Sequence, residues 1–489
     1  RKDLGRLILL ILLYTLQGVP LGLTFGSIPF LLKSKTTYKD IALFSLTQYP
    51  YSLKLLWSPV VDSYYVPRFG RRKSWIVPIQ AITGIALILM GTVIDEQIAA
   101  SIVPVNTLAL GFTILVLLCA TQDIAVDGWA LTLLSEENKA YASTAQTIGL
   151  NTGYFLSFTV FLALNSTEFC NKYLRTTPMD QGVLQLGGYL MFWGICYLLC
   201  DVFLLFYDEN RNQQSQDEDE DSGLRKVYTD IIRVIRMPHM LRLIAVLMVA
   251  KIGFVANEAV TGLRLLELGL QKEDLALAVL LDFPFQIMMG YYTAKWSKGD
   301  RPLRPWLYAF AGRLAMALGG MGLVYGFPAD GVVTPHYFVI IMASMVLGSF
   351  MSTVQFVGLG SFFTVISDPS IGGTYMTLLN TLSNLGGTWP RYFVLRAVDM
   401  LSQSECRIPA SAAANGTRTG APPLANGTAL LTDGDRAACK AAGGAVNTLS
   451  DGYFAVSGGT LLLGLAITLF FIVPSTLYLE RLPTAAWRL

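Results

Sequence analysis

Charged and amide side chains within long apolar stretches are the residues of this sequence best suited to chemistry. The segment Gln122-Asp-Ile-Ala-Val-Asp127 places two carboxylates four residues apart, on one face of a helix. Lys54, Lys251 and Arg264 stand in other apolar stretches, and such cations suit phosphate and carboxylate groups. Because a charge at the centre of a bilayer costs at least about 2.5 kcal/mol, each needs a partner, water or a function. We expect a basic cavity for an anionic ligand.

The candidate binding residues share a polar or aromatic side chain within such a stretch. They are Lys54, Tyr49, Tyr51, Gln122, Asn151, Lys251, Asn257, Glu258, Arg264, Asn380, Asn384 and Trp389. A second interpretation, that these groups only join helices through ion pairs, hydrogen bonds and packing, stays open. Lys251 and Glu258, for example, are seven residues apart and share one helix face. Arg313 and Arg391 lie nearer helix ends, where a long side chain can reach the membrane surface.

A basic loop forms a second candidate site. Asp62 followed by Gly70-Arg-Arg-Lys73 resembles the Asp…Gly-Arg-Arg signature of major facilitators, with a longer spacer than usual. In that family the basic loop pairs with acidic residues at nearby helix ends and holds one conformation. The resemblance implies a gate formed by Asp62, Arg71, Arg72, Asp123 and Asp127. The alternative is that Asp123 and Asp127 carry protons.

The composition indicates a membrane protein. Of 489 residues, 53% are hydrophobic and only 14% are charged, whereas soluble domains carry about 25% charged residues. The net charge of +2 includes no basic stripe for nucleic acid. The sequence has two distant histidines and no metal-ligand spacing, phosphate-binding loop or nucleophile elbow. We therefore expect no catalytic residues, no metal and no cofactor, and the protein is predicted not to be an enzyme.

Twelve apolar stretches are long enough to cross the roughly 30 Å of hydrocarbon in a bilayer. They run at about 5–32, 38–65, 74–94, 102–133, 139–164, 184–207, 239–267, 273–296, 303–326, 335–366, 371–399 and 453–479. An acidic segment after residue 207 and an Ala-, Gly-, Asn- and Thr-rich segment at about 400–450 are too polar for lipid. The prediction is an all-α membrane protein with a six-helix half (1–207), an acidic linker (208–237) and a second six-helix half (238–489), whose segment at about 400–450 forms an exposed, poorly ordered loop.

Two signals place both chain termini on the cytosolic side. Lys and Arg concentrate in the loops assigned to that side, at 68–73, 225–236 and 295–304. Glycosylation sequons fall on the opposite, lumenal side, at Asn165, Asn415 and Asn426. Cys406 and Cys439 fall there too, where an oxidising compartment allows a disulfide between them.

The two predicted halves repeat one another at an offset of about 234 residues. Tyr49-Pro-Tyr51 matches Phe283-Pro-Phe285, and Asn151-Thr-Gly153 matches Asn384-Leu-Gly386. Six helices repeated in one orientation are typical of the major facilitator fold, in which the substrate binds between the halves near the bilayer midplane.

Long motifs throughout the chain resemble the acetyl-coenzyme A transporters of the endoplasmic reticulum membrane. They are Ala120-Thr-Gln-Asp-Ile-Ala-Val-Asp-Gly-Trp-Ala-Leu-Thr132, Ser367-Asp-Pro-Ser-Ile-Gly-Gly-Thr-Tyr-Met-Thr-Leu-Leu-Asn380, Leu53-Lys-Leu-Leu-Trp57, Phe69-Gly-Arg-Arg-Lys-Ser-Trp75, Phe169-Cys-Asn-Lys-Tyr-Leu174 and Asn384-Leu-Gly-Gly-Thr-Trp-Pro390. The resemblance implies a solute carrier that moves acetyl-coenzyme A from the cytosol into the lumen by alternating access, where it donates acetyl groups to proteins and gangliosides. It implies no particular binding residues.

Other functions stay open at this stage. Bacterial muropeptide permeases are more distant relatives of the same fold, so another large anion, such as oxidised glutathione or a muropeptide-like solute, is a second candidate substrate. A non-transporting sensor or scaffold of this fold is a candidate of a different class. A homodimer also stays open.

Overall fold

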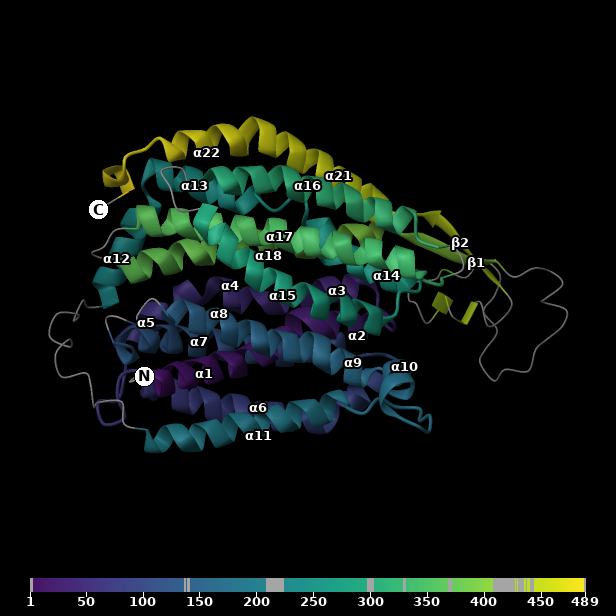
Figure 1. The fold of residues 1–489 in the computed structure, drawn as a ribbon, viewed down its shortest axis with the longest axis horizontal. Coiled ribbons are helices and arrows are strands. Elements are labelled where there is room, and N and C mark those ends of the chain that lie inside the picture. The colour runs from purple at the N-terminus through teal and green to yellow at the C-terminus, as the bar shows by residue number, and fades with distance from the viewer. Residues whose placement is uncertain are drawn as a thin grey trace.

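The protein is a bundle of helices whose axes run roughly along one direction (Figure 1). The computed structural model describes residues 3–135, 138, 141–207, 224–296, 303–328, 331–367, 372–407 and 444–487, with 427, 429, 435, 436, 438 and 439 between the last two ranges. The described residues form twelve helical segments of membrane length, several of them interrupted, and one two-stranded sheet.

Six of these segments come from the N-terminal part of the chain. They are α1–η1–α2 (Leu4–Gly22, Leu23–Ser27, Ile28–Lys33), α3–η2–α4–η3–α5 (Tyr38–Ser45, Leu46–Gln48, Tyr49–Leu53, Lys54–Leu56, Ser58–Ser63), α6 (Lys73–Ala99), α7 (Val105–Leu133), α8–η5–α9 (Tyr141–Phe155, Leu156–Val160, Phe161–Asn165) and α11 (Leu186–Phe206). The short helices α10 (Thr167–Phe169) and η6 (Cys170–Leu174) follow α9. One hydrophobic cluster, which includes Leu13, Phe112 and Tyr197, joins all six segments.

The C-terminal part of the chain forms the other six segments. They are α13–η8–α14 (Pro238–Val249, Asn257–Thr261, Gly262–Leu268), α15 (Lys272–Trp296), α16 (Leu303–Tyr325), α17 (Pro335–Ile366), α18 (Gly372–Leu401) and α21–η10–α22 (Gly452–Ile467, Thr468–Ile472, Val473–Glu480). Helix α12 (Leu224–Ile235) precedes them, and the turn η11 (Thr484–Trp487) follows them. The Tyr228 hydroxyl of α12 donates to the Leu56 carbonyl at 2.7 Å, so this part of the predicted linker packs on the N-terminal part.

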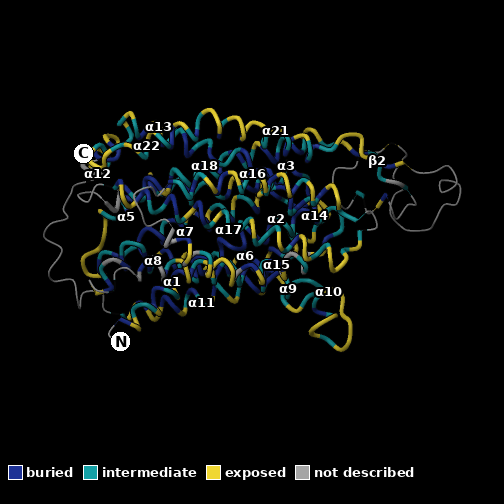
Figure 2. The backbone as a smooth tube through the Cα atoms, turned by 45° about the horizontal axis from the view of Figure 1, so that its top comes forward, coloured by how far each residue is buried: buried dark blue, intermediate teal, exposed yellow. Residues whose placement is uncertain are grey.

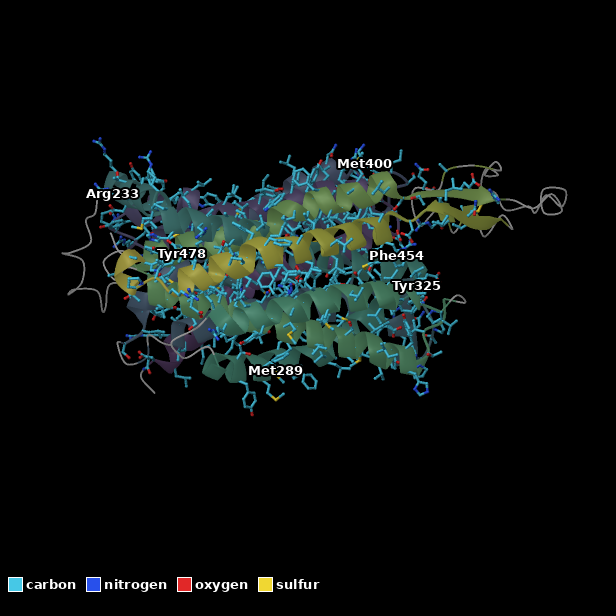
Figure 3. All side chains as sticks on the ribbon, turned by 90° about the horizontal axis from the view of Figure 1, so that it is seen from above. Arg233, Met289, Tyr325, Met400, Phe454 and Tyr478 are labelled. Atoms are coloured by element: carbon cyan, nitrogen blue, oxygen red, sulfur yellow. A yellow bond between two sulfur atoms is a disulfide. The ribbon has the colours of Figure 1, made fainter. Side chains whose placement is uncertain are left out.

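Two opposite faces of the bundle are distinguished by the segments that they carry. We call one of them the terminal face, because both chain ends lie there, together with α5 and α12 (Figure 1). We call the opposite one the loop face, where α10 and the sheet lie. Arg233 and Met400 mark the two faces in the view from above (Figure 3).

Eight of the described segments are long and apolar enough to cross a membrane, by length and composition alone. The other four begin at residues 38, 238, 272 and 372, and they are interrupted or carry charged side chains. In chain order these are the second, seventh, eighth and eleventh segments. The predicted fold places all four along the path between its halves, where polar residues and broken helices are tolerated.

The outer surface of the bundle carries exposed apolar side chains. They include Leu89 of α6, Phe206 of α11 and Phe470 of η10, with 63%, 86% and 84% of their surfaces exposed. Exposed and buried residues alternate along these outer helices (Figure 2). Large apolar side chains that stay exposed over whole helices are expected where lipid, rather than water, surrounds a protein.

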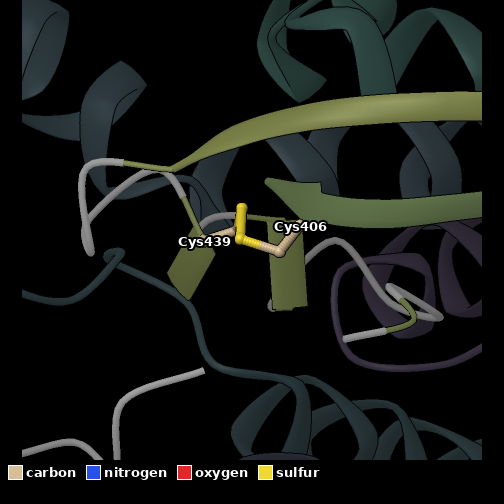
Figure 4. The surroundings of a disulfide bond; sticks show 2 residues. All are labelled: Cys406 and Cys439. Carbon is tan, nitrogen blue, oxygen red and sulfur yellow. A yellow bond between two sulfur atoms is a disulfide. The ribbon is translucent and has the colours of Figure 1, made fainter. Parts of the chain in front are cut away.

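The segment at about 400–450 is more ordered at its ends than the sequence indicated. Strands β1 (Gln403–Arg407) and β2 (Ala445–Ser450) pair antiparallel, and a disulfide joins Cys406 to Cys439 with 5.8 Å between their Cα atoms (Figure 4). Composition did not predict these strands because they are short and flank a long polar insertion. They bring the end of α18 next to the start of α21.

Candidate functional site

A cluster of ionised side chains lies inside the N-terminal half. Lys54 stands at the interruption between α4 and α5, in η3. Its ammonium group forms an ion pair with the Asp123 carboxylate of α7 and lies 3.9 Å from an Asp127 oxygen. The Asp123 side chain is fully buried, whereas 40% of the Asp127 side chain is exposed. The structure therefore places Lys54 against both carboxylates that were predicted to share a helix face.

Neutral side chains complete the hydrogen bonding of this cluster. The Tyr51 hydroxyl donates to Asp123 at 3.2 Å, and the Tyr14 hydroxyl donates to Asp127 at 2.7 Å. The Gln146 amide donates to Asp127 at 2.8 Å. Sequence analysis missed Tyr14 and Gln146, since a lone hydroxyl or amide in an apolar stretch usually indicates packing. With two carboxylates facing it, Lys54 is less available to an anion than predicted.

The basic loop of the predicted gate contacts Asp62 and α7. Arg72 forms an ion pair with Asp62 at 2.5 Å, and the Arg71 guanidinium donates to the Asp62 carbonyl at 3.1 Å. The Arg72 guanidinium lies on α7, since a methyl group on Gly128 would come within 2.3–2.6 Å of it. The basic loop therefore reaches α7 next to Asp127, and Lys54 forms the ion pairs with Asp123 and Asp127 described above.

The seventh helical segment is broken where Lys251 stands. Residues 250–254 form turns between α13 and the resumed helix, and within them the Val255 amide donates to the Lys251 carbonyl at 2.9 Å. The break interrupts the regular helical spacing from which Lys251 and Glu258 were predicted to share one face. Glu258 forms its ion pair with Arg313 of α16, and Arg313 also donates to Gln355 at 2.7 Å. Arg313 therefore lies inside the bundle, paired, and not at a helix end.

Two cations of the C-terminal half have no acidic partner among the described residues. Lys251 and Arg391 are both half-buried and make no ion pair there, and the Nε atom of Arg391 is buried without an acceptor. Lys251 also lines a cavity of about 100 Å³ together with Ser352, Gln355, Ser383 and Asn384. This volume corresponds to about three water molecules.

The remaining predicted binding residues are spread along the bundle. Asn151, Asn380 and Asn384 are exposed on their membrane-spanning helices, while Tyr49 is half-buried. Trp389 donates from its indole nitrogen to the Met248 carbonyl at 2.9 Å, and the Asn257 oxygen accepts from Thr261 at 3.0 Å. Gln122 is buried and has no hydrogen-bond partner within the described part of the chain. The structure thus brings Asn384 and Lys251 to one cavity and leaves Asn257 and Trp389 in structural contacts.

Arg264 belongs to an ionic network at the loop face and not to a central cavity. Glu267 of α14 forms ion pairs with Lys33 of α2 at 2.5 Å, with Arg264 at 2.5 Å and with Arg436 at 3.2 Å. Arg264 also pairs with Asp451 at 2.7 Å. We call these five residues the loop-face network. It borders a cavity of about 360 Å³. Sequence analysis missed Lys33 and Glu267, because charges at the ends of apolar stretches are usually flanking residues.

The two halves meet through specific contacts at two levels. Lys33 and Glu267 join α2 to α14 at the loop face, and only 3% and 2% of their side chains are exposed. Nearer the middle, the hydroxyl groups of Ser52 and Thr388 form a 2.8 Å hydrogen bond between α4 and α18. The charged groups described above therefore lie on both sides of an interface between the N-terminal and C-terminal helices.

The other predicted sites are described only in part. Asn165 ends α9 at the loop face, and its amide donates to the Leu184 carbonyl at 3.1 Å. Asn415 and Asn426 lie outside the described residues. Within the residues that are described, no group of three His, Cys, Asp or Glu side chains could hold a metal ion.

Comparison with known proteins identifies the family. The family model of acetyl-coenzyme A transporter 1 matches residues 6–219, 208–304 and 298–489. The chain belongs to the acetyl-coenzyme A transporter family. An uncharacterised membrane protein of Saccharomyces cerevisiae is 39% identical to this transporter over 564 residues, which cover 100% of this chain and 98% of the yeast protein. An uncharacterised protein of Schizosaccharomyces pombe is 41% identical over 488 residues, or 100% of this chain and 89% of its own.

More distant similarities agree with a membrane transporter. The anhydromuropeptide permease of Escherichia coli is 29% identical over 150 residues, which are 30% of this chain and 29% of the permease. The solved structure of the nucleoside transporter NupG has a TM-score of 0.59 at 11% identity, covering 98% of this chain and 99% of that one. A D-xylose-proton symporter has a TM-score of 0.56 at 14% identity, with 96% and 98% covered. These likenesses confirm the predicted all-α major facilitator fold, and the family and fold are those of transporters, not enzymes.

Proposed function

We propose that this transporter carries acetyl-coenzyme A from the cytosol into the lumen of the endoplasmic reticulum by alternating access. The family supports the substrate, since the matching family model is that of acetyl-coenzyme A transporter 1. The geometry supports a polyanion, because Lys251 and Arg391 lack acidic partners among the described residues. Uncompensated cations inside a membrane protein are costly unless a ligand or water balances them. This excess of positive charge is the observation that carries the proposal.

The closed loop face supports the alternating-access part of the proposal. Lys33 and Glu267 join the halves there in a buried ion pair, and the hydrophobic contact of Ala42 with the C-terminal helices lies beside it. An interface of this kind has to separate when substrate leaves on that side. In a major facilitator the two halves rock about a fixed site, so the contacts at one face break as those at the other form.

Charge and disulfide chemistry support the proposed direction. Basic side chains at the terminal face, such as Arg72 and Arg233, favour its assignment to the cytosol by the positive-inside rule. The disulfide between Cys406 and Cys439 favours an oxidising compartment, such as the lumen, at the loop face. Asn165 is then a candidate for glycosylation on the lumenal side.

The test is uptake of labelled acetyl-coenzyme A into liposomes that contain the purified protein. We expect saturable, protein-dependent entry that unlabelled acetyl-coenzyme A suppresses. Oxidised glutathione is the competing anion, and liposomes without protein are the control. Tight binding without entry would instead support a sensor or scaffold, and entry of glutathione alone would replace the substrate. Epitope tags at both termini, tested after selective permeabilisation of the plasma membrane, check the cytosolic assignment.

A muropeptide-like solute is the second candidate substrate. The similarity to the anhydromuropeptide permease favours it, although that similarity covers 30% of this chain. A muropeptide-like competitor in the same liposome assay separates the two candidates, because only a solute that shares the site suppresses entry of acetyl-coenzyme A.

A further inference from the structure

The side chain of Lys251 lies against α18 at Gly387, a residue that has no side chain. A methyl group on Gly387 would come within 2.7 Å of the Lys251 Nζ atom and 2.8 Å of its Cδ atom. A methyl group on Gly386 would meet the Leu247 carbonyl oxygen at 2.1 Å. The pair of glycines therefore lets the broken seventh segment approach α18 closely, and Lys251 extends over the gap at Gly387.

Arg391 follows Gly387 by one helical turn on the same face of α18. Residues four apart in a helix share a face, so the ammonium group of Lys251 and the guanidinium of Arg391 lie near one another. The positive charge of Lys251 also interacts with those of Arg391 and Arg313. Across the interface, Arg391 interacts electrostatically with Tyr154 of α8, in the N-terminal half.

Two other cations inside the membrane-spanning helices have acidic partners, which Lys251 and Arg391 lack among the described residues. Lys54 pairs with Asp123, and Arg313 pairs with Glu258. Asp282 of α15 takes its hydrogen bonds from Ser349 at 2.5 Å and Gln286 at 2.7 Å and makes no ion pair among the described residues. Two neighbouring cations that repel each other at the interface between the halves suit an anion with more than one charged oxygen. Arg supplies a planar fork for two oxygens and Lys a point charge, which together suit a phosphate group.

We propose that Lys251 and Arg391 bind the phosphate groups of the transported substrate. The assignment rests on the proposed function for the identity of the substrate. It adds that the protein recognises the phosphate groups of that substrate. Asn384, which lines the small cavity beside Lys251, is placed to donate a further hydrogen bond. The acetyl and pantetheine parts of the substrate carry no phosphate, so this pair does not recognise them.

The experiment measures binding by purified protein of three probes, which are acetyl-coenzyme A, inorganic pyrophosphate and S-acetylpantetheine. Lys251→Gln and Arg391→Gln are each expected to weaken acetyl-coenzyme A and pyrophosphate binding by about 10- to 100-fold, the range for a hydrogen bond to a charged group. Binding of S-acetylpantetheine, which has no phosphate, is expected to stay unchanged. The matched control is Arg233→Gln on α12, whose side chain is 67% exposed.

A second variant tests the phosphate site even if the charge-removing variants fail to fold. Gly387→Ala keeps both cations and displaces the Lys251 ammonium group, so it is expected to weaken phosphate binding while the protein stays folded. Folded variants that bind acetyl-coenzyme A as tightly as the unmodified protein would overturn the assignment and leave the proposed function intact. Conversely, pyrophosphate binding that depends on Lys251 and Arg391, without acetyl-coenzyme A binding, would uphold the phosphate site and refute the proposed substrate.

Discussion

Replacement of Glu267 by Gln tests whether the loop-face network holds the two halves together. Glu267 is the carboxylate that Lys33, from the other half, reaches at 2.5 Å. Glu267→Gln leaves the Lys33 ammonium group, 3% exposed, without this partner, whereas Arg264 keeps Asp451 at 2.7 Å. Removing one partner of a buried ion pair costs about 3–5 kcal/mol. When the halves separate, water reaches Lys33, so this cost falls on the closed state.

The expected result is a large shift toward states that are open at the loop face. A change of about 3–5 kcal/mol corresponds to a roughly 100- to several thousand-fold shift in the equilibrium. Lys33→Met should shift it less, because Glu267 keeps its ion pairs with Arg264 and Arg436. The double variant should resemble Lys33→Met, since it also lacks the Lys33 ammonium group.

The assay is labelling of a cysteine placed beneath the network. Ala42→Cys, at a position that is fully buried against the C-terminal helices, would be introduced with the free cysteines replaced by serine. A membrane-impermeant maleimide supplied at the loop face is expected to label it faster in the Glu267→Gln background. Glu405→Gln is the matched control, because Glu405 pairs with Arg407 within β1 and joins no helices. Unchanged labelling in folded Glu267→Gln protein would refute the reasoning.

Three further predictions concern stability. Asp123→Asn should lower thermal stability in detergent by up to about 3–5 kcal/mol because it leaves the Lys54 ammonium group with only Asp127, at 3.9 Å, and Lys54→Met combined with Asp123→Asn should restore part of the loss; equal melting of the single and double variants would contradict this. Cys439→Ser opens a link that spans 33 residues, worth about 3–4 kcal/mol of chain entropy, so limited proteolysis should cleave the loop faster while the helices melt as before; unchanged cleavage would count against it. Hydrogen bonds from Ser135 and Asn138 lower the pKa of Asp3 from 3.8 to about 2, so its carboxylate stabilises the fold above pH 3.8 and loses this contribution as the pH falls toward 2. Asp3→Asn should therefore lower the melting temperature by the same amount at every pH from 5 to 7, and a difference that varies across this range would show that another group is responsible.

The helices were predictable because their signal is local. A membrane-spanning helix needs a long apolar run, so the segments at 335–366 and 303–325 follow from hydropathy almost to the residue. The strands β1 and β2 were not predictable in this way. Their pairing joins residues that are more than 35 positions apart, and short strands beside a long polar insertion leave little pattern in the composition.

The partners of the buried charges were harder to predict than their presence. Regular helical spacing predicted that Lys251 and Glu258 share one helix face, but turns at residues 250–254 interrupt the helix, and Glu258 pairs with Arg313. The distance of Arg391 from the middle of its apolar run suggested a surface role, yet its Nε atom is buried. Which cation faces which carboxylate depends on the rotation of one helix against another, and that rotation has no local signature.

The sequence by itself determined that this chain is a helical membrane protein of two related halves, and its motifs indicated the family. Apolar length, repeat and motif are properties of the chain in order, so no tertiary contact is needed to recognise them. Only the tertiary structure decided that Asp123 neutralises Lys54, that Glu267 receives a cation from the opposite half, and that Lys251 and Arg391 lack an acidic partner among the described residues. These findings concern contacts between side chains of different helices, and such contacts form only when the helices pack.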